Sequence, residues 1–389
     1  MRVIHTSDWH AGRVWKGRHR LEETAAALDH LARFVESERV DLVLHSGDVF
    51  DASVPVGEAE RLVYQFLKRV GRAGAKTVVI AGNHDNPARM QAWGLLAELA
   101  DAYAVARPAR PDRGGVVVLE TRSGERARVA ALPFASMGTL LPAAELAATD
   151  GTPYADYADA IRRMLGALSA SFGRDAVNLL IAHTLIEGAV LAGSERRATV
   201  GSEWATTAQA LPSRAQYIGL GHIHRPQRID AAPAPTFYAG SLLQMDFGEA
   251  GEAKSFVFIE ASPGRPAAVR TVPYEGTRSL EHVQMTLPEL EVQAGSLRAR
   301  DCHLEVTVIS PHYDPDVAAK VRRLLPEVLA VHQDYPELPR EATVARRGLA
   351  PQELFALYYK TRHGTVPDAA LLDAFARLLE TATAPGGGG

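Results

Sequence analysis

The chain has 389 residues, 47% of them hydrophobic and 23% charged, and a formal net charge of −4. This length exceeds what one hydrophobic core usually organises, and the composition is that of a globular protein, so two or more domains are expected. The charge lacks the strongly basic signature of many nucleic-acid binders, so any DNA-binding surface must be local.

The cysteine content and the N-terminus indicate the compartment. Cys302 is the single cysteine, which excludes an intramolecular disulfide and a zinc site built from cysteines, and fits a reducing compartment. The start of the chain turns polar at once and does not resemble a signal peptide, and no apolar run approaches the length of a membrane span. We therefore expect a cytoplasmic protein with no membrane partner.

The first predicted strand begins at Val3 and Ile4 and leads into Asp8-Trp9-His10. In extended chain, residues i and i+2 face the same side, so Asp8 and His10 can converge on one metal ion. A carboxylate combined with an imidazole suits Mn, Fe or Zn rather than Ca or Mg. Taken alone, these residues are better explained as a polar loop after a strand.

Predicted helices and strands then alternate. These elements are a helix over 21–35, a strand over 41–44, a helix over 57–72 and a strand over 76–80. The alternation indicates an α/β sheet with mainly parallel strands, and such sheets bind ligands at the carboxyl ends of their strands. Asp48 stands at that end of the second strand, in Gly47-Asp48-Val49-Phe50-Asp51.

The third strand runs into Gly82-Asn83-His84-Asp85. Gly82 allows a sharp turn close to a ligand, and Asn83 offers a carbonyl oxygen to a hard cation. His84 can move a proton near neutral pH, and Asp85 can hold that imidazole in one tautomer through its other ring nitrogen. For these four residues alone, a polar turn remains the alternative.

Two strands that end in histidine complete the pattern. Between them and the third strand, the sequence predicts a loop over 107–115, a hairpin over 116–119 and 128–132, and a helix over 154–171. Buried strands over 178–183 and 217–221 end in His183 and in His222-Ile223-His224. A lone histidine at a strand end is usually structural, but His222 and His224 repeat the i, i+2 spacing of the first motif.

Seven side chains at strand ends offer metal-binding atoms: Asp8, His10, Asp48, Asn83, His183, His222 and His224. If Asp48 bridges, two ions receive four protein ligands each, which suits an in-line displacement at phosphorus. His5 and His45 lie within apolar strands and are predicted to be core residues or to support the ligands. The other histidines are assigned to the surface or to packing: His19, His30, His282, His303, His312, His332 and His363.

Five motifs resemble those of the calcineurin-like metallophosphoesterases in order and spacing: Asp8-Trp9-His10, Gly47-Asp48, Gly82-Asn83-His84-Asp85, Ala182-His183 and Gly221-His222-Ile223-His224. Within that superfamily the chain is similar to the SbcD-type nuclease subunits, relatives of the Mre-eleven nucleases. This similarity rests on residues 4–10 and 47–51, and on Tyr238-Ala239-Gly240-Ser241 followed by Glu249 and Lys254. It covers most of the chain and is strongest up to about residue 260.

The resemblance implies a β-sandwich flanked by helices, with two divalent ions of which manganese is expected and magnesium or iron are alternatives. It places one ion on Asp8, His10, Asp48 and His224, and the other on Asp48, Asn83, His183 and His222. His84 is implied to be a general acid, or to stabilise developing charge, with Asp85 orienting it. Some relatives have a histidine where this chain has Asp51, so Asp51 receives no catalytic role.

The chain after about residue 274 predicts further domains. An alternating strand over 300–309, a helix over 315–325 and a strand over 328–331 predict a small α/β module, which the resemblance implies is a capping domain that docks DNA. A sheet extension without a DNA role is the alternative. The predicted parts are a nuclease domain over 1–273, a capping domain over 274–338, a linker over 339–351, a helical segment over 352–381 and a flexible tail over 382–389.

The helical segment has many large apolar residues: Leu354, Phe355, Leu357, Tyr358, Leu371, Leu372, Phe375, Leu378 and Leu379. A pair of helices with a wide apolar face usually needs a partner, and folding back on its own domain is the alternative. The resemblance implies that the partner is an SbcC-like ATPase, and that the chain forms a homodimer within a heterotetramer that acts on DNA at the nucleoid.

The implied function is a metal-dependent DNA nuclease of DNA repair, with 3′–5′ exonuclease activity on duplexes and endonuclease activity on single strands and hairpins. A small-substrate phosphodiesterase is the enzymatic alternative. A protein phosphatase would share the ligands, but the added module and helices argue against it. A metal-stabilised scaffold is the non-enzymatic alternative; it would be expected to lack some ligands or His84, and none is missing.

Overall fold

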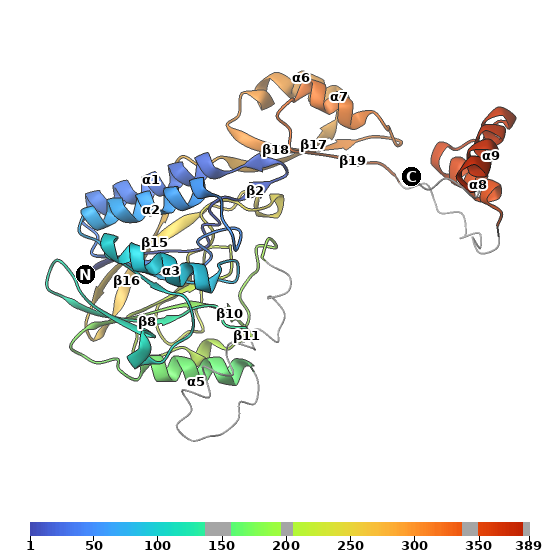
Figure 1. The fold of residues 1–389 in the computed structure, drawn as a ribbon. Helices are drawn as coiled ribbons and strands as arrows, with labels where there is room; N and C mark the ends of the chain where they lie inside the picture. The colour runs from blue at the N-terminus through green and yellow to red at the C-terminus, as the bar shows by residue number, and fades with distance from the viewer. Residues whose placement is uncertain (137–156, 196–204, 337–348, 384–389) are drawn as a thin grey trace. The chain divides into compact units, whose positions relative to one another are not determined.

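The computed structural model describes residues 1–136, 157–195, 205–336 and 349–383. The chain divides into two compact units, one of Met1–Ile309 with Asp314–Asp334 and one of Ser310–Tyr313 with Tyr335–Gly389. The first unit contains two large sheets and a small one, and the second contains two helices (Figure 1). Among the described residues, no helix is both long and apolar enough to cross a membrane.

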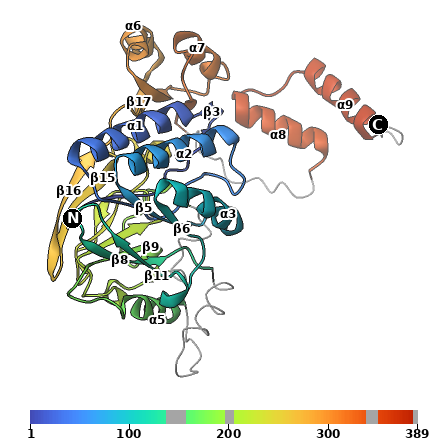
Figure 2. The ribbon, with the colours of Figure 1, turned by 60° about the vertical axis from the view of Figure 1, so that its left-hand side comes forward.

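The first large sheet has six strands in the order β16-β15-β1-β4-β5-β6. Its strands are β1 (Arg2–Thr6), β4 (Leu42–His45), β5 (Lys76–Ile80), β6 (Ala102–Val105), β15 (Ser255–Ser262) and β16 (Arg265–Pro273). The four strands from β1 to β6 are parallel, and β15 and β16 add an antiparallel hairpin beside β1. The helices α1 (Leu21–Glu38), α2 (Gly57–Arg72) and α3 (Pro87–Ala97) cover its outer face (Figure 2).

The second large sheet also has six strands, in the order β13-β14-β12-β9-β8-β7. Its strands are β7 (Val116–Glu120), β8 (Arg126–Leu132), β9 (Val177–His183), β12 (Tyr217–Gly221), β13 (Gln227–Arg228) and β14 (Thr236–Tyr238). The central four are parallel, and β7 and β13 pair antiparallel at the edges. The helix α5 (Tyr157–Ser169) packs on its outer face. Two short pairs are β2 (Val14–Trp15) with β3 (Arg18–His19), and β10 (Leu185–Ile186) with β11 (Ala205–Thr206).

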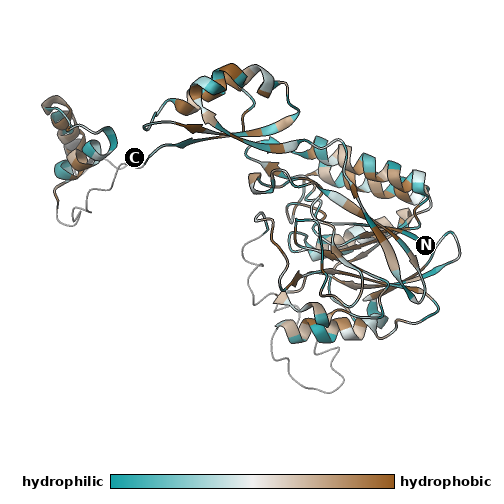
Figure 3. Cartoon of the chain, turned by 180° about the vertical axis from the view of Figure 1, so that it is seen from behind, coloured by the Kyte–Doolittle hydropathy of each residue, from teal (hydrophilic) through white to brown (hydrophobic). Residues whose placement is uncertain are grey.

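The two sheets pack face to face as a β-sandwich, because alternate residues of each strand point to opposite faces. Val3 and Leu44 of the first sheet share a buried cluster with Val129 and Ile181 of the second. The intervening Ile4 instead joins the cluster under the helices. The inner strands of both sheets are therefore mostly hydrophobic, as in Leu42–His45 and Val177–His183 (Figure 3). The predicted α/β sandwich flanked by helices is confirmed.

The predicted capping module is a three-stranded parallel sheet with two crossover helices. Its elements are β17 (Ser279–Thr286), α6 (Leu287–Arg298), β18 (Cys302–Ile309), α7 (Val317–Leu324) and β19 (Ala330–Asp334). The side chains of Thr286 and Glu289 form a capping box at the start of α6. Leu280 packs with Trp15 and Phe247 of the sandwich, which connects the module to the sandwich.

The predicted elements agree with the structure in most places. The helix over 57–72 and the strand over 76–80 have the predicted bounds, and the predicted hairpin is β7 with β8. The helix predicted over 154–171 is found over Tyr157–Ser169, and residues 154–156 lie outside the described part. The strand predicted over 328–331 begins at Ala330, and β15, β16, β17 and α6 were not predicted.

The second unit is a helical hairpin of α8 (Pro351–His363) and α9 (Ala369–Thr383). The turn between them begins at Gly364, which adopts a left-handed φ of 73° that ends α8. The rings of Phe355 and Phe375 stack at 4.2 Å and hold the helices together. Most of the predicted linker and the last six residues of the predicted tail lie outside the described residues.

Candidate metal centre

The predicted ligands converge at one edge of the sandwich, where parallel strands of both sheets end. The first sheet contributes the loops after β1, β4 and β5, and the second contributes the ends of β9 and β12. Each of these strands is an apolar run that is buried in the core, so the first polar residues after it lie at the rim. The structure brings all seven together: Asp8, His10, Asp48, Asn83, His183, His222 and His224.

Four of the ligands have backbone conformations that non-glycine residues rarely adopt. The φ angles of Asp8, His10, Asp48 and His222 are 49°, 46°, 56° and 101°. Hydrogen bonds between the loops hold this conformation, because Asp8 N donates to Gly47 O at 3.0 Å and His10 N donates to Asp48 O at 3.1 Å. Such strained conformations concentrate at functional sites, where they point side chains inward.

Gly82 allows two of these loops to approach each other. A Cβ atom at this position would lie 2.1 Å from Asp48 Oδ1 and 2.3 Å from Asp48 N, which no side chain can tolerate. Gly82 is therefore needed for close approach rather than for an unusual φ. The loop after β5 can pack directly on the Asp48 backbone only because position 82 has no side chain.

The first group of ligands consists of Asp8, His10 and His224, whose potential ligand atoms lie within 4.8 Å of one another. His10 Nε2 and His224 Nε2 are 3.2 Å apart. The carboxylate of Asp8 accepts from His222 N at 3.2 and 3.3 Å, which fixes its position. All three side chains are buried.

The second group consists of Asn83, His183 and His222. Asn83 Oδ1 lies 2.8 Å from His183 Nε2 and 3.0 Å from His222 Nδ1. Asp48 lies between the two groups, since its Oδ2 is 3.7 Å from His10 Nε2 and 3.6 Å from His183 Nε2. This position is the one required of a carboxylate that bridges two ions.

The charges of the centre favour cations. Burial and the neighbouring Asp48 raise the pKa of Asp8 well above its usual range. Burial also opposes ionisation of Asp48, but His183 and His10 outweigh it and lower the pKa of Asp48. Two buried carboxylates beside one another are destabilising unless cations compensate them, and carboxylate, imidazole and amide donors suit Mn or Fe. The residues therefore fit a pair of divalent ions.

The contacts of His84 and Asp85 correct one prediction. His84 Nδ1 donates to the backbone carbonyl of Asp51 at 2.9 Å, so this carbonyl orients the imidazole. The Asp85 carboxylate instead accepts from the backbone N–H groups of Val49, Phe50 and Gly82 at 3.2, 3.1 and 2.9 Å. The prediction that Asp85 orients His84 is therefore wrong. Three backbone donors surround the carboxylate, which therefore joins the loops after β4 and β5.

The two histidines predicted to be core or supporting residues are buried as expected. His5 lies between Tyr217 Oη and Ser46 Oγ, each at 2.8 Å, and burial lowers its pKa to about 3. The His45 ring packs edge-on against Trp9, and burial lowers its pKa to about 3 as well. Both imidazoles are neutral at neutral pH and support the strand ends that carry the ligands.

Four polar residues near the ligands received no role in the sequence analysis. Asp51 Oδ1 lies 3.3 Å from His10 Nδ1, and Ser194 Oγ lies 2.5 Å from His224 Nδ1. Glu195 accepts from His224 N at 3.1 Å, and Glu249 accepts from Ser194 Oγ. Glu249 and Asp51 had a signal in the sequence, as part of the family similarity, whereas Ser194 and Glu195 had none. Both of the latter are remote in sequence from His224.

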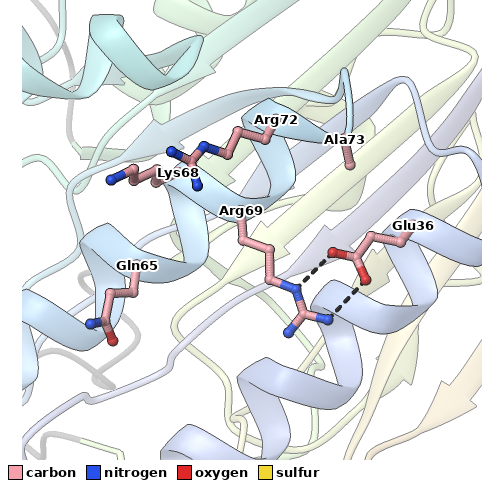
Figure 4. Close-up of a pocket in the computed structure, with 6 residues that line it drawn as sticks. All are labelled: Glu36, Gln65, Lys68, Arg69, Arg72 and Ala73. Carbon is pink, nitrogen blue, oxygen red and sulfur yellow. Dashed lines mark hydrogen bonds and ion pairs between the residues drawn. The ribbon is translucent and has the colours of Figure 1, made fainter.

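A hollow of about 550 Å³ on α1 and α2 does not belong to the centre. Glu36, Lys68, Arg69 and Arg72 are among its lining residues. Figure 4 shows the Arg69 guanidinium paired with the Glu36 carboxylate, at 2.7 and 2.8 Å. Arg69 also contacts Asp29 at 2.6 Å, so its charge is compensated locally. The hollow contains none of the predicted site residues.

The chain is similar to two family models and to several known proteins. A family model described as calcineurin-like phosphoesterase matches residues 1–125, and one described as type 5 capsule protein repressor C-terminal domain matches residues 276–363. The D subunit of the nuclease SbcCD from Bacillus subtilis (strain 168) is 30% identical over 97% of this chain and 97% of its own length. The protein of the same name from Rhodobacter capsulatus is 31% identical over 75% of this chain and 76% of its own. That from Staphylococcus epidermidis is 25% identical over 85% of each.

Proposed function

The chain belongs to the family of SbcCD nuclease D subunits, and on that premise we propose that it hydrolyses phosphodiester bonds of DNA with two divalent metal ions. The observation that carries the proposal is the place of Asp48, whose Oδ2 lies 3.7 Å from His10 and 3.6 Å from His183. A carboxylate between two sets of ligands is the arrangement that holds two ions at phosphoryl-transfer sites.

We assign Asp8, His10, Asp48 and His224 to one ion, and Asp48, Asn83, His183 and His222 to the other. Manganese is the ion that we propose, because this mixture of imidazole, carboxylate and amide oxygen suits it better than magnesium. Burial lowers the pKa of His183 and of His224, so both rings are in the neutral, metal-binding form.

The ions, when bound, supply Lewis acidity toward the phosphodiester and a water of lowered pKa. The protein supplies the position of the reacting groups. Asn83 and His84 are half-buried at the rim, where a substrate can reach them. His84 Nδ1 donates to the Asp51 carbonyl, so the proton that His84 exchanges is the one on Nε2. From there His84 protonates the leaving oxygen as general acid.

Three further parts of the function are proposed from their position. The domain division at 273 and 338, with the capping module docking DNA, is supported by the separate core of that module. The helical hairpin is proposed to bind an SbcC-like ATPase, because Tyr358 and Leu378 are exposed on it. A homodimer is supported by Leu95, Leu96 and Leu99, exposed large apolar residues in and just after α3.

One experiment separates this function from its enzymatic alternative. The purified chain is incubated with manganese and three substrates: linear duplex DNA with the ATPase partner, a DNA hairpin, and bis(p-nitrophenyl) phosphate. We expect cleavage of both DNA substrates that ceases with a chelator. Cleavage of the small diester with no cleavage of either DNA would instead identify a small-substrate phosphodiesterase, and cleavage of none would favour the scaffold.

A further inference from the structure

His224 of the first group and His183 of the second differ in the hydrogen bonds that support them. Behind His224, Ser194 Oγ lies 2.5 Å from Nδ1 and donates its own proton to Glu249 Oε1. Glu249 is fully buried, its Oε2 accepts from Met245 N at 2.9 Å, and the ammonium of Lys254 lies 2.7 Å away. A buried lysine, carboxylate and hydroxyl therefore form a continuous chain that ends on a predicted ligand.

This chain determines the tautomer of His224. The Glu249 carboxylate faces the Lys254 ammonium and the Met245 amide, so it only accepts hydrogen bonds. The Ser194 hydroxyl has one proton and gives it to Glu249, so its oxygen must accept from His224 Nδ1–H. The lone pair of the ring is then on Nε2, the atom that lies 3.2 Å from His10 Nε2.

The other histidine of the first group has a carboxylate beside it, although no hydrogen bond joins them. His10 Nδ1 lies 3.3 Å from Asp51 Oδ1, and the guanidinium of Arg13 lies 3.0 Å from the same oxygen. In the first group, the hydrogen-bonded carboxylate support is therefore the one that reaches His224 through Ser194. Carboxylate partners of this kind orient a ligating imidazole and make it a stronger donor to the metal.

In the second group, the support of His183 is neutral. His183 Nδ1 donates to the backbone carbonyl of Ser46 at 2.8 Å. A carbonyl fixes the tautomer of His183, but it carries no charge and raises the basicity of the ring less than a carboxylate does. In addition, Asn83 contributes a neutral amide where the first group has the Asp8 carboxylate.

We propose that the two metal positions bind with unequal affinity, and that Ser194 and Glu249 are positioning residues that make the His10–His224 position the tighter one. This inference rests on the proposed function, since it presupposes two ions. The tighter position fills first and keeps its ion when metal is scarce. The Asn83–His183 position exchanges its ion freely and limits activity at low metal concentration.

The test is a manganese titration of the full chain, stripped of metal, by isothermal calorimetry and by electron paramagnetic resonance. We expect two ions, with one equivalent giving the signal of an isolated ion and the second equivalent giving that of a coupled pair. Ser194→Ala should weaken the first binding step about 10–100-fold, the usual effect of losing such a support, and leave the second unchanged. Ser194→Thr, which keeps the hydroxyl, should restore it.

Glu249→Gln and Glu252→Gln form a matched pair. Both glutamates contact Lys254, at 2.7 and 3.1 Å, but only Glu249 contacts Ser194. Glu249→Gln should weaken the first step like Ser194→Ala, and Glu252→Gln should not. If Glu249→Gln fails to fold, Ser194→Ala decides the question, because Ser194 is only half-buried.

Two further variants identify the positions. Asn83→Ala should abolish the weaker step and keep the tighter one, whereas His10→Ala should abolish the tighter one. Equal affinities in the unmodified chain, or a first step that Ser194→Ala leaves unchanged, would overturn the inference while the two-metal site stands. Binding of no manganese by the unmodified chain would overturn the proposed function itself.

Discussion

The loops of the metal centre and the C-terminal hairpin depart from a well-packed protein in opposite ways. In the loops, four non-glycine residues have positive φ, and the Asp8 and Asp48 carboxylates are buried together. In the hairpin the helices are regular, yet α8 has no buried residue and Tyr358 and Leu378 are 59% and 69% exposed. The first region buries polar groups that the proposed cations would compensate, and the second exposes apolar groups that the proposed partner would cover. We therefore interpret the loops as a metal-binding site and the hairpin as a protein-binding site.

Replacing the shared carboxylate should abolish the function of the metal centre. Asp48→Ala is expected to abolish cleavage of every substrate and to lower the occupancy of both ions, because Asp48 Oδ2 contacts histidines of both groups. Metal content is measured by inductively coupled plasma mass spectrometry. As a control, the α8–α9 hairpin of this variant should still bind the ATPase partner. Two ions per chain in this variant would rule out bridging by Asp48.

Removing the general acid should have the next largest effect. His84→Gln is expected to reduce turnover by roughly 10²–10⁴-fold, the usual contribution of a positioned acid. Both ions and DNA affinity should remain, because His84 is outside the proposed ligand set. Single-turnover cleavage rates and metal analysis on the same sample test whether turnover falls while both ions remain bound. Loss of one ion would show that His84 is a ligand.

Changes in the hairpin should leave chemistry intact and weaken assembly. Leu378→Glu is expected to weaken binding of an SbcC-like ATPase about 10–100-fold, since burying a leucine stabilises by about 1.5–3 kcal/mol and tenfold corresponds to 1.4 kcal/mol. Leu378 is exposed, so the hairpin should still fold, whereas Phe375→Glu also breaks the stack with Phe355. Cleavage of a DNA hairpin by the chain alone serves as control.

A chain that ends at Pro339 should show the same separation, with cleavage of simple substrates retained and partner binding lost. Full-strength copurification of this truncated chain with the ATPase would exclude the helical hairpin as the docking element. Loss of simple-substrate cleavage in a folded truncated chain would place the helical hairpin in the catalytic unit.

The smallest expected effect concerns Asp85. Asp85→Asn replaces an acceptor oxygen by a donor amide against Val49, Phe50 and Gly82 N–H, so about 1–3 kcal/mol of stability should be lost. The pH profile of turnover should keep its shape, because His84 is oriented by the Asp51 carbonyl. A shifted pH profile with unchanged denaturant midpoint would restore the predicted Asp85–His84 contact.

The sequence predicted which polar side chains converge better than it predicted the residues that support them. Asp8, His10 and His183 each follow an apolar strand, and short apolar runs with polar ends are visible without a structure. The role of Asp85 was not predictable in this way, because its partners are backbone groups of two loops that meet only in the folded chain. Ser194 lies outside any motif and far in sequence from Glu249, so only the fold shows their contact.

The same limit applies to the capping module. β18 was predicted because Leu304, Val306 and Val308 alternate with polar residues. The helix α6 buries only Leu290, Ala294 and Leu297, and its remaining residues give little helical periodicity, so it was missed. Hydrophobic periodicity reveals a helix that has a clearly apolar face. It fails for a short helix that buries only a few of its own side chains.

The most direct test of the central claim is anomalous X-ray diffraction from crystals of the full chain grown with manganese. We predict two anomalous peaks about 3.5–4 Å apart, with the Asp48 carboxylate between them, His10 and His224 on one and His183 and His222 on the other. A single peak, or two peaks that do not share Asp48, would contradict the account.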